Sequence, residues 1–504
     1  MRLLINKPGI LVYLTLLISF SAGCNPNLLA NESPISSVPI DAAIPQSQPK
    51  PYQPESQQSY QVQLPAPISS QPPSTTPKPL QLSLKLEHQI GQMLMVGFRG
   101  LSTRDQGVKD IIRDIKRFNL GGVILFDYDI PSKSSRRNIQ SPKQVKALVE
   151  QLQAASPISL FIAIDQEGGK IQRLKKKFGF PSTASAQYLG NKNDLALTHK
   201  QASILAKNLA GLGINFNFAP VVDLNINPSN PVIGKLRRSF SADPNIVTQH
   251  AQTFIEAHHR YGVLCAIKHF PGHGSSTKDS HWGLVDVTNS WREQELEPFK
   301  KLIGKTDAIM TAHVFNRKLD KKYPATLSQN IVNGRLRQQL GYKGVIVSDD
   351  MQMEAIAHHY TRQQAIQKTL EAGIDIIVIG NNLKYENNVV SNTVRIIKQL
   401  VNEGTITEAR IEKSYQRIQQ LKNQLLKRQR TSNQKYRLTV NAVPTGSRIR
   451  IMNIGPKYFP GIELAPGTYD ILVEKPGYIP SQKPVTLRAQ DMTISVTLTA
   501  QQGQ

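Results

Sequence analysis

From about residue 82 to residue 428, short apolar runs alternate with longer amphipathic stretches. The runs are Met93–Phe98, Gly122–Phe126, Leu160–Asp165, Ile214–Val222, Leu264–Phe270, Ala308–His313, Gly344–Asp349 and Ile374–Gly380. They are rich in β-branched residues, mostly lack polar alternation, and are separated by segments of helical length, as strands buried in a parallel sheet are. Eight such runs predict an α/β fold, a TIM-type (β/α)8 barrel. A doubly wound open sheet fits the same pattern.

The pattern changes after an amphipathic segment at Ile406–Leu426, which predicts a closing helix. A basic linker is expected at residues 429–435. Residues 436–500 then alternate apolar and polar positions, with turn signals such as Pro466-Gly467 and Pro476-Gly477 between the alternating segments. This tail is therefore expected to form a small C-terminal all-β sandwich domain.

The first 24 residues have the layout of an export signal. Arg2 and Lys7 precede an apolar run, Gly9–Phe20, that is too short to span a bilayer. Small residues then precede Cys24, as in a bacterial lipobox, although Ser21 stands where leucine is usual. We expect a lipidated Cys24, with plain secretion and loss of Cys24 as the alternative. The protein would then be exported and anchored to a membrane, facing the periplasm or cell wall.

Residues 25–81 are rich in Pro, Ser and Gln and carry few charges. Such a segment buries too little apolar surface to offset its ordering entropy, so we expect a disordered tether. The only cysteine besides Cys24 is Cys265, which lies inside an apolar run. No disulfide is therefore expected, and the hydrophobic core must hold the fold together.

The chain has 61 Lys and Arg against 36 Asp and Glu, a formal net charge of +25. The basic residues are spread along the sequence, and no nucleic-acid-binding module is recognisable. We therefore expect no nucleic-acid partner. The charge instead favours anionic surroundings such as a membrane surface or a cell-wall polymer.

Polar residues stand at the ends of five predicted strands, where a barrel places its chemistry. They are Asp165, Asp223, Lys268-His269, His313 and Asp349. One such residue could be a helix cap, but five on one rim indicate a functional site.

The segment from Lys268 to Gly274 is a glycine-rich and proline-containing loop, and Asp279-Ser280-His281 follows it. In an extended loop, Asp279 and His281 point the same way, and the carboxylate would orient the imidazole and favour its protonated form. The pair could protonate a leaving oxygen and later deprotonate a water molecule. A metal site is the alternative, since His269, His273, His281 and Asp279 are all ligand types. Because Phe-Pro-Gly separates the first two histidines, no helical His-x-x-x-His pair can form, and we expect no metal.

Asp349 is the second candidate for chemistry. A carboxylate at a strand end, held by nearby donors, stays ionised near neutral pH. It could attack an anomeric carbon and form a covalent glycosyl intermediate. Asp350 is expected to point away and cap the following helix.

These motifs resemble glycoside hydrolase family 3, in particular its bacterial β-N-acetylhexosaminidase branch. The shared segments are Ile164–Arg173, Arg238-Ser239-Phe240, Lys268–Gly274, Asp279-Ser280-His281 and Ser348-Asp349-Asp350. The resemblance implies Asp349 as nucleophile and His281 as acid/base, assisted by Asp279. It also implies that N-acetylglucosamine is bound by Asp165, Arg173, Arg238, Lys268 and His269. The loop departs from many relatives at Ser275-Ser276-Thr277, where they carry Asp-Thr or Asp-Val.

The turn spacing of the tail resembles PEGA domains of surface proteins. The resemblance as a whole implies a retaining enzyme, without cofactor and monomeric, that removes β-linked N-acetylglucosamine from peptidoglycan fragments. Two alternatives stay open: a β-glucosidase of the same family, and a wall-binding lipoprotein without activity. The first usually shows Ser-Asp-Trp at Ser348–Asp350 and a second α/β domain, and the second would be expected to lose Asp349 or His281. Phosphate in place of water as acceptor is also open.

Overall fold

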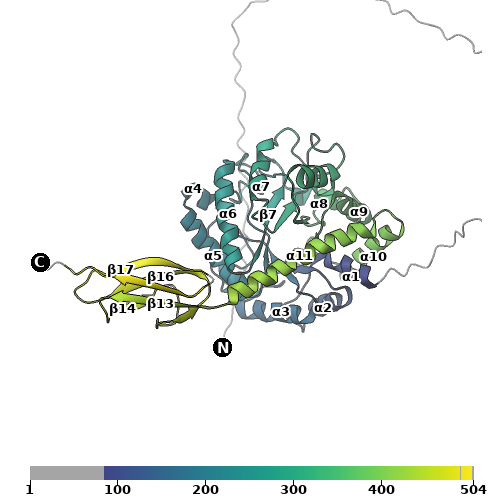
Figure 1. Ribbon diagram of the computed structural model, residues 1–504. Helices are drawn as coiled ribbons and strands as arrows, with labels where there is room; N and C mark the ends of the chain where they lie inside the picture. Colours follow the sequence, from purple (N-terminus) through teal and green to yellow (C-terminus); the bar gives the residue numbers. More distant parts are fainter. Residues whose placement is uncertain (1–83, 489, 502–504) are drawn as a thin grey trace, which may run out of the picture. The chain divides into compact units, whose positions relative to one another are not determined.

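The computed structural model describes residues 84–488 and 490–501 (Figure 1). The expected signal peptide with Cys24 and the expected tether lie outside the described residues. Within the described ranges, no helix is both long and apolar enough to cross a membrane.

Eight parallel strands form the centre of the larger part of the chain. They are β1 (Leu94–Gly97), β2 (Gly122–Ile124), β3 (Phe161–Ile164), β6 (Phe216–Asn217), β7 (Leu264–Phe270), β9 (Ala308–Thr311), β11 (Val345–Val347) and β12 (Ile377–Ile379). The strand order is β11-β9-β7-β6-β3-β2-β1-β12, and a parallel bridge between Val347 and Ile376 joins the two outer strands. The sheet thus closes into the predicted barrel, and the open-sheet alternative is wrong.

Helices surround this barrel, as Figure 1 shows. They are α1 (Leu84–Gln92), α2 (Gln106–Phe118), α3 (Pro142–Ala155), α4 (Ala186–Lys192), α5 (Leu195–Gly211), α6 (Pro244–Arg260), α7 (Glu297–Leu302), α8 (Glu354–Ala357), α9 (Arg362–Ala372), α10 (Val389–Asn402) and α11 (Glu408–Asn433). Local sequence explains several starts: Ser141 and Asp243 accept backbone N–H bonds as N-caps, each followed by proline at the first helical position. Thr361 and Gln364 form a capping box at α9.

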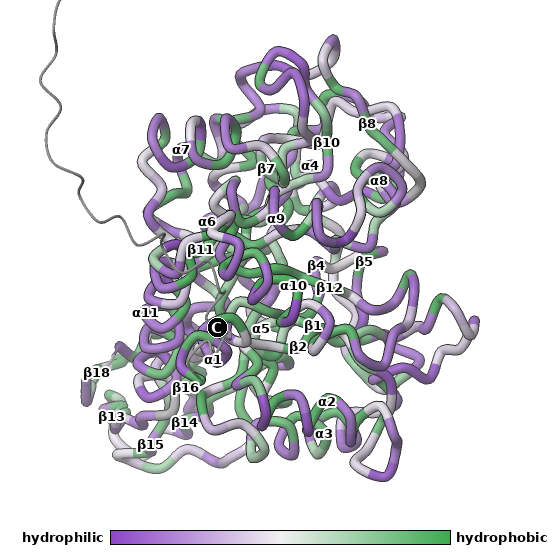
Figure 2. The backbone as a smooth tube through the Cα atoms, turned by 90° about the vertical axis from the view of Figure 1, so that its right-hand side faces the viewer, coloured by the Kyte–Doolittle hydropathy of each residue, from purple (hydrophilic) through white to green (hydrophobic). Residues whose placement is uncertain are grey.

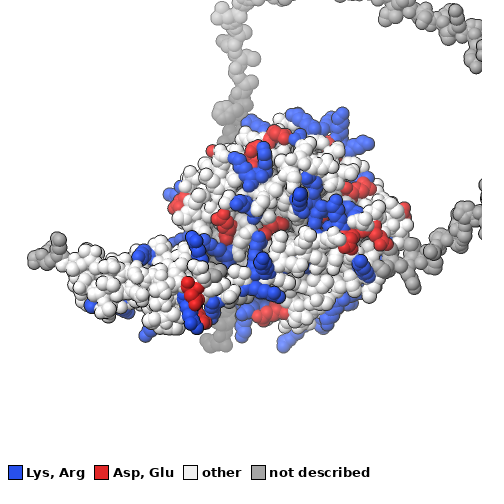
Figure 3. Space-filling view, in the orientation of Figure 1, with Lys and Arg blue, Asp and Glu red and all other residues white. Residues whose placement is uncertain are grey.

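The hydrophobic core lies in and around the strands. All four residues of β3 and all seven of β7 are buried, which explains why these runs lack polar alternation. Figure 2 shows the same distribution, with hydrophobic segments at the strands and hydrophilic segments in the outer loops. Lys and Arg side chains are scattered over the face in Figure 3, among fewer acidic ones, rather than gathered in one patch.

The closing helix α11 is longer than the sequence pattern indicates. It continues to Asn433, so most of the residues expected to form a linker are helical. The sequence from Lys427 to Arg430 consists of good helix formers. In addition, Arg428 is ion-paired with the buried Asp307, which gives this turn a tertiary contact.

The C-terminal part is built from two three-stranded sheets. Its strands are β13 (Tyr436–Val443), β14 (Arg448–Ile451), β15 (Ile462–Leu464), β16 (Gly467–Glu474), β17 (Ser481–Leu487) and β18 (Met492–Thr497). The orders are β15-β13-β18 and β14-β16-β17. Alternate residues such as Leu438, Val440, Ile471 and Val473 are buried in one core. The predicted small all-β domain is confirmed.

Asp375, just before β12, anchors α11 to the barrel. Its carboxylate is fully buried and accepts from Ser414 Oγ at 2.6 Å and Arg417 Nη1 at 3.0 Å on α11, and from Arg337 Nη2 at 2.5 Å. The single negative charge of Asp375 therefore lies between two arginine cations, and the same carboxylate also orients the Ser414 hydroxyl.

We predict that Asp375→Asn lowers the free energy of unfolding by about 3 kcal/mol, because it leaves buried cations without their counter-ion. Urea unfolding followed by circular dichroism measures the change. Lys146→Ala serves as the control, since that lysine is 58% exposed and its pair with the exposed Glu150 contributes at most about 1 kcal/mol. Equal stability losses in the two variants would contradict the prediction.

Candidate active site

The residues predicted to bind sugar come together at the C-terminal ends of neighbouring strands. Asp165 follows β3, and Lys268 lies in β7. Lys268 Nζ donates to Asp165 Oδ1 at 2.8 Å, and Arg173 Nη2 donates to Asp165 Oδ2 at 3.1 Å. Burial by itself would raise the pKa of Asp165, but the attraction of Lys268 and Arg173 outweighs it and holds the pKa well below its usual range. Asp165 is therefore an anion held between two cations.

Glu167 belongs to the same cluster, although sequence reasoning assigned it no role. Its carboxylate receives two hydrogen bonds from Arg238, at 2.7 and 2.8 Å, and lies 2.8 Å from Lys268 Nζ. Despite burial, these cations lower its pKa to about 2. The available signal was its spacing: Glu167 stands two positions after Asp165, and extended backbone points such residues to the same side.

His269 also faces this cluster, although consecutive residues of a regular strand point to opposite sides. The pairing of β7 with β9 explains the exception, because its register shifts between Ile267 and Phe270. A bulge of this kind redirects side chains at a barrel rim. As a result Lys268 reaches Asp165, while His269 Nε2 lies 3.2 Å from Arg238 Nη2.

Asp279 and His281 form the predicted carboxylate–imidazole pair, with 2.7 Å between Asp279 Oδ1 and His281 Nδ1. The backbone differs from the expected extended loop. Residues Ser280–Trp282 form a short 3-10 turn, and Asp279 is its N-cap, accepting from the His281 N–H at 2.9 Å. Capping therefore produces the contact that the extended loop was expected to produce.

The turn that carries His281 packs against α8, the helix that follows Asp349 in the chain. Burial would lower the pKa of His281, but the hydrogen bond that its ring donates to Asp279 and the attraction of Asp349 and Asp279 raise it. The imidazole is still 47% exposed, so a ligand can reach it. The structure thus brings the His281 and Asp349 segments together on one face of the barrel.

Asp349 itself follows β11 and is half-buried. Its Oδ1 accepts the N–H of Asp350 at 2.8 Å. Burial would raise the pKa of Asp349, but the attraction of His313, His269 and His281 and this backbone donor lower it. Asp349 is therefore ionised at neutral pH, the state that a nucleophilic carboxylate requires.

His313 is fully buried and contacts the backbone next to Asp349. Its Nδ1 lies 2.9 Å from Thr326 Oγ1, and its Nε2 lies 3.0 Å from the Asp350 carbonyl oxygen. Burial lowers the pKa of His313, and both ring nitrogens are held by these two contacts. It thus fixes the backbone directly after Asp349.

The expectation that Asp350 caps the following helix is wrong. Helix α8 begins after Met353 and has no side-chain cap. The Asp350 carboxylate instead accepts from the N–H of Gly380 at 2.9 Å and of Gln352 at 3.1 Å. It therefore ties the end of β11 to the residue that follows β12, a contact invisible to local sequence because the partners are far apart in the chain.

The histidines considered as metal ligands have separate partners. His269 Nδ1 contacts Asp223, His273 contacts Ser276 and Ser280, and His281 contacts Asp279. Among the residues that the structure describes, no three His, Cys, Asp or Glu side chains are grouped so that they could hold a metal ion.

Two protein-family models match this chain. Residues 85–421 match the family model "Glycosyl hydrolase family 3 N terminal domain", and residues 435–504 match the PEGA domain model. Beta-hexosaminidase A of Pseudoalteromonas piscicida is 37% identical over 336 residues, covering 59% of this chain and 54% of that protein. This chain thus spans about half the length of that relative. A beta-hexosaminidase of Tolumonas auensis is 38% identical over 276 residues, or 54% of this chain and 78% of the relative.

Solved structures of similar fold include the glycoside hydrolase family 3 beta-N-acetylglucosaminidase of Paenibacillus sp. (TM-score 0.62, 31% identity, 71% of this chain and 73% of that chain). The beta-N-acetylhexosaminidase of Beutenbergia cavernae gives a TM-score of 0.60 at 28% identity and covers 67% of this chain and 98% of that one. The matched family model covers the whole barrel together with all eight predicted site residues. This protein therefore belongs to glycosyl hydrolase family 3.

Proposed function

We propose that this protein is a retaining β-N-acetylhexosaminidase that removes terminal β-linked N-acetylglucosamine. The observation that carries the proposal is the pairing of an ionised Asp349 with a His281 whose pKa is raised, on one face of the barrel. A retaining glycosidase needs one anion to attack the sugar and one acid to protonate the leaving group. The names of the related hexosaminidases point to the same reaction.

In the first step, a carboxylate oxygen of Asp349 attacks the anomeric carbon while His281 gives its proton to the glycosidic oxygen. The bond between carbon and leaving group breaks, and a glycosyl ester of Asp349 forms. In the second step, the now neutral His281 takes a proton from water, whose oxygen attacks the anomeric carbon and releases Asp349. Asp279 holds the imidazole and stabilises its cationic form throughout.

The charge cluster beside this pair is suited to hold the sugar. Asp165 can accept hydrogen bonds from two neighbouring hydroxyls, while Arg173, Arg238 and Lys268 can donate to others. Asp165 and Glu167 offset two of these three positive charges, so the cluster can bind a neutral sugar with a net charge of only about +1.

The proposed natural substrate is peptidoglycan-derived glycan, cleaved outside the cytoplasm by a monomer anchored through a lipid on Cys24. The export pattern of the first 24 residues supports this location. The net charge of +25 supports an anionic wall or membrane surface as its surroundings.

We expect the purified protein to release nitrophenol from the p-nitrophenyl β-N-acetylglucosaminide, at a kcat/KM at least about tenfold above that for the matching glucoside. A difference of this size corresponds to about 1.4 kcal/mol. Absorbance of nitrophenolate measures both rates. Activity on the glucoside alone would move the assignment to the β-glucosidase branch.

Asp349→Ala should reduce turnover to background, since no other group can form the glycosyl ester. His281→Ala should slow cleavage of a poor leaving group such as an alkyl alcohol by about 10²- to 10⁴-fold, the usual contribution of a general acid. Dinitrophenolate needs little protonation, so its release should slow far less. Equal losses for both leaving groups would argue against His281 as the acid.

Asp279→Asn should shift the basic limb of the kcat/KM profile to lower pH. Asp279 raises the pKa of His281, and the acid form of His281 is lost as pH rises through that pKa, so removing the anion moves this loss downward. Stopped assays over a pH series measure the limb. Asp286→Asn is the control, because Asp286 is an exposed carboxylate on β8 (Val285–Asp286) without a catalytic partner; an unmoved limb in Asp279→Asn would contradict the assigned role.

A further inference from the structure

Asp223, one of the polar residues at the predicted strand ends, is a buried carboxylate that takes no part in the proposed reaction steps. It has no exposed surface and lies after β6, close to the end of β7. Oδ1 accepts two backbone N–H groups, from His269 at 3.2 Å and from His273 at 2.8 Å. Oδ2 accepts from the ring Nδ1 of His269 at 2.6 Å. These three donors hold the carboxylate in its ionised form, with its pKa lowered.

The contact with His269 fixes which ring nitrogen carries the proton. An ionised carboxylate only accepts hydrogen bonds, so Nδ1 must carry the hydrogen. In the neutral ring, Nε2 is then an acceptor, and it faces the Arg238 guanidinium at 3.2 Å. His269 therefore presents a lone pair, rather than a second donor, to a cluster already rich in donors.

The contact with His273 fixes the loop that carries the acid/base candidate. The buried His273 ring bridges two hydroxyls, with Nδ1 at 2.8 Å from Ser276 Oγ and Nε2 at 3.2 Å from Ser280 Oγ. Ser280 directly precedes His281. Burial lowers the pKa of His273 to about 4, so the ring stays neutral and can accept at one nitrogen while it donates at the other.

We propose that Asp223 is a positioning residue that serves both halves of the site. Through Oδ2 it sets the His269 tautomer whose single Nε2 lone pair accepts from Arg238 or, in its place, from a sugar hydroxyl. Through Oδ1 it holds the backbone of His273 and, by way of Ser280, the His281 turn. This inference rests on the proposed function and names a residue that the reaction needs but that does not touch the substrate.

The pattern of acceptors makes Asp223→Asn a specific test. The amide oxygen must take the place of Oδ1, because two backbone N–H groups point there. The amide NH2 then faces His269 Nδ1 and donates to it, so the ring proton moves to Nε2. A donor at Nε2 opposes the Arg238 N–H groups, which should weaken sugar binding.

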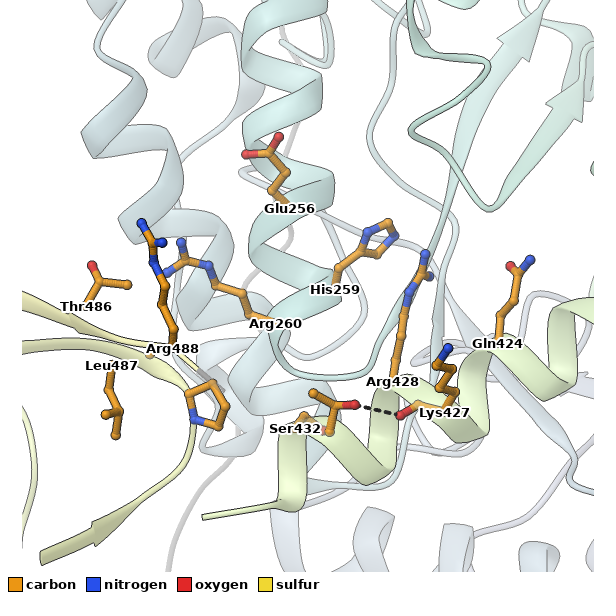
Figure 4. A pocket seen from close by; sticks show the side chains of 13 residues that line it. Glu256, His259, Arg260, Gln424, Lys427, Arg428, Ser432, Thr486, Leu487 and Arg488 are labelled. Carbon is orange, nitrogen blue, oxygen red and sulfur yellow. Dashed lines mark hydrogen bonds between the residues drawn. The ribbon is translucent and has the colours of Figure 1, made fainter. Parts of the chain in front are cut away.

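The matched control, Asp307, binds the opposite end of β7: it accepts the N–H of Cys265 near the start of that strand, whereas Asp223 accepts the N–H of His269 near its end. Asp307 is buried and also binds an imidazole, His259 Nε2 at 2.7 Å, and a backbone N–H, that of Cys265 at 2.8 Å. Arg428 is its cationic partner. Figure 4 shows His259 on α6 and Arg428 on α11, which both line a pocket that contains none of the catalytic residues. Asp307→Asn therefore changes a similar network of hydrogen bonds without touching the catalytic rim.

We expect Asp223→Asn to raise KM and the dissociation constant of N-acetylglucosamine about 10- to 100-fold, because a buried hydrogen-bonding group with a mismatched partner weakens binding by about this factor. Its kcat should fall for the alkyl glycoside. Asp307→Asn should lower the melting temperature but leave KM and kcat unchanged. Nitrogen-15 NMR of the full chain should show a hydrogen on Nδ1 of His269 in the parent and on Nε2 in Asp223→Asn.

His273→Gln separates the two effects and covers the case in which Asp223→Asn fails to fold. It should lower kcat for the alkyl glycoside while binding of N-acetylglucosamine stays within about twofold of the parent. A parent His269 with its hydrogen on Nε2, or equal kinetic losses in Asp223→Asn and Asp307→Asn, would overturn the proposal. A parent that binds N-acetylglucosamine yet cleaves no glycoside would instead overturn the proposed function, because tautomer and binding would still report on Asp223.

Discussion

The polar rim of this barrel depends on one buried cation, Lys268. An ammonium group that is 3% exposed is tolerated only with close counter-charges. Lys268 Nζ has two, Asp165 and Glu167, each at 2.8 Å, and these acids are in turn paired with Arg173 and Arg238. Removing any one member leaves the others uncompensated. The cluster is thus held as a unit, which preserves its geometry before a ligand arrives.

The histidines of the site show how the surroundings decide the state of one kind of side chain. His273 and His313 are enclosed, and burial lowers the pKa of both, to about 4 for His273. His281 is half exposed and lies beside two carboxylates, which raise its pKa. An imidazole with access to solvent and a nearby anion can give up and regain a proton near neutral pH. The two buried rings serve as hydrogen-bonding links.

Buried carboxylates serve different purposes at the two ends of the barrel. Near the starts of β9 and β12, Asp307 and Asp375 fix α11 to the barrel through arginines. At the other rim, Asp165, Glu167 and Asp223 hold groups that face the proposed sugar site. The first arrangement contributes to stability, and the second to the precision with which donors and acceptors are placed.

The sequence by itself determined the eight strands and the family resemblance, whereas the closure of the sheet into a barrel was decided by the contact between Val347 and Ile376. Buried parallel strands must be apolar throughout, and a closed barrel brings all their carboxyl ends to one rim. Asp165, Lys268, His269 and Asp349 could therefore be assigned to one site from their positions alone. The catalytic roles of Asp349 and His281 stay predictions, since the geometry shows only that the two segments meet.

Only the tertiary structure decided which side chain or backbone group each charged residue of the site contacts. Glu167 meets Arg238, Asp223 meets His269, and Asp350 meets Gly380. The sequence separations of these pairs are 71, 46 and 30 residues, so no local pattern records them. Likewise the last turns of α11 are helical where a linker was expected, because Arg428 finds a buried acid on the barrel. Periodicity reports which face a residue occupies, but the choice of a charged group's partner is made by the folded chain.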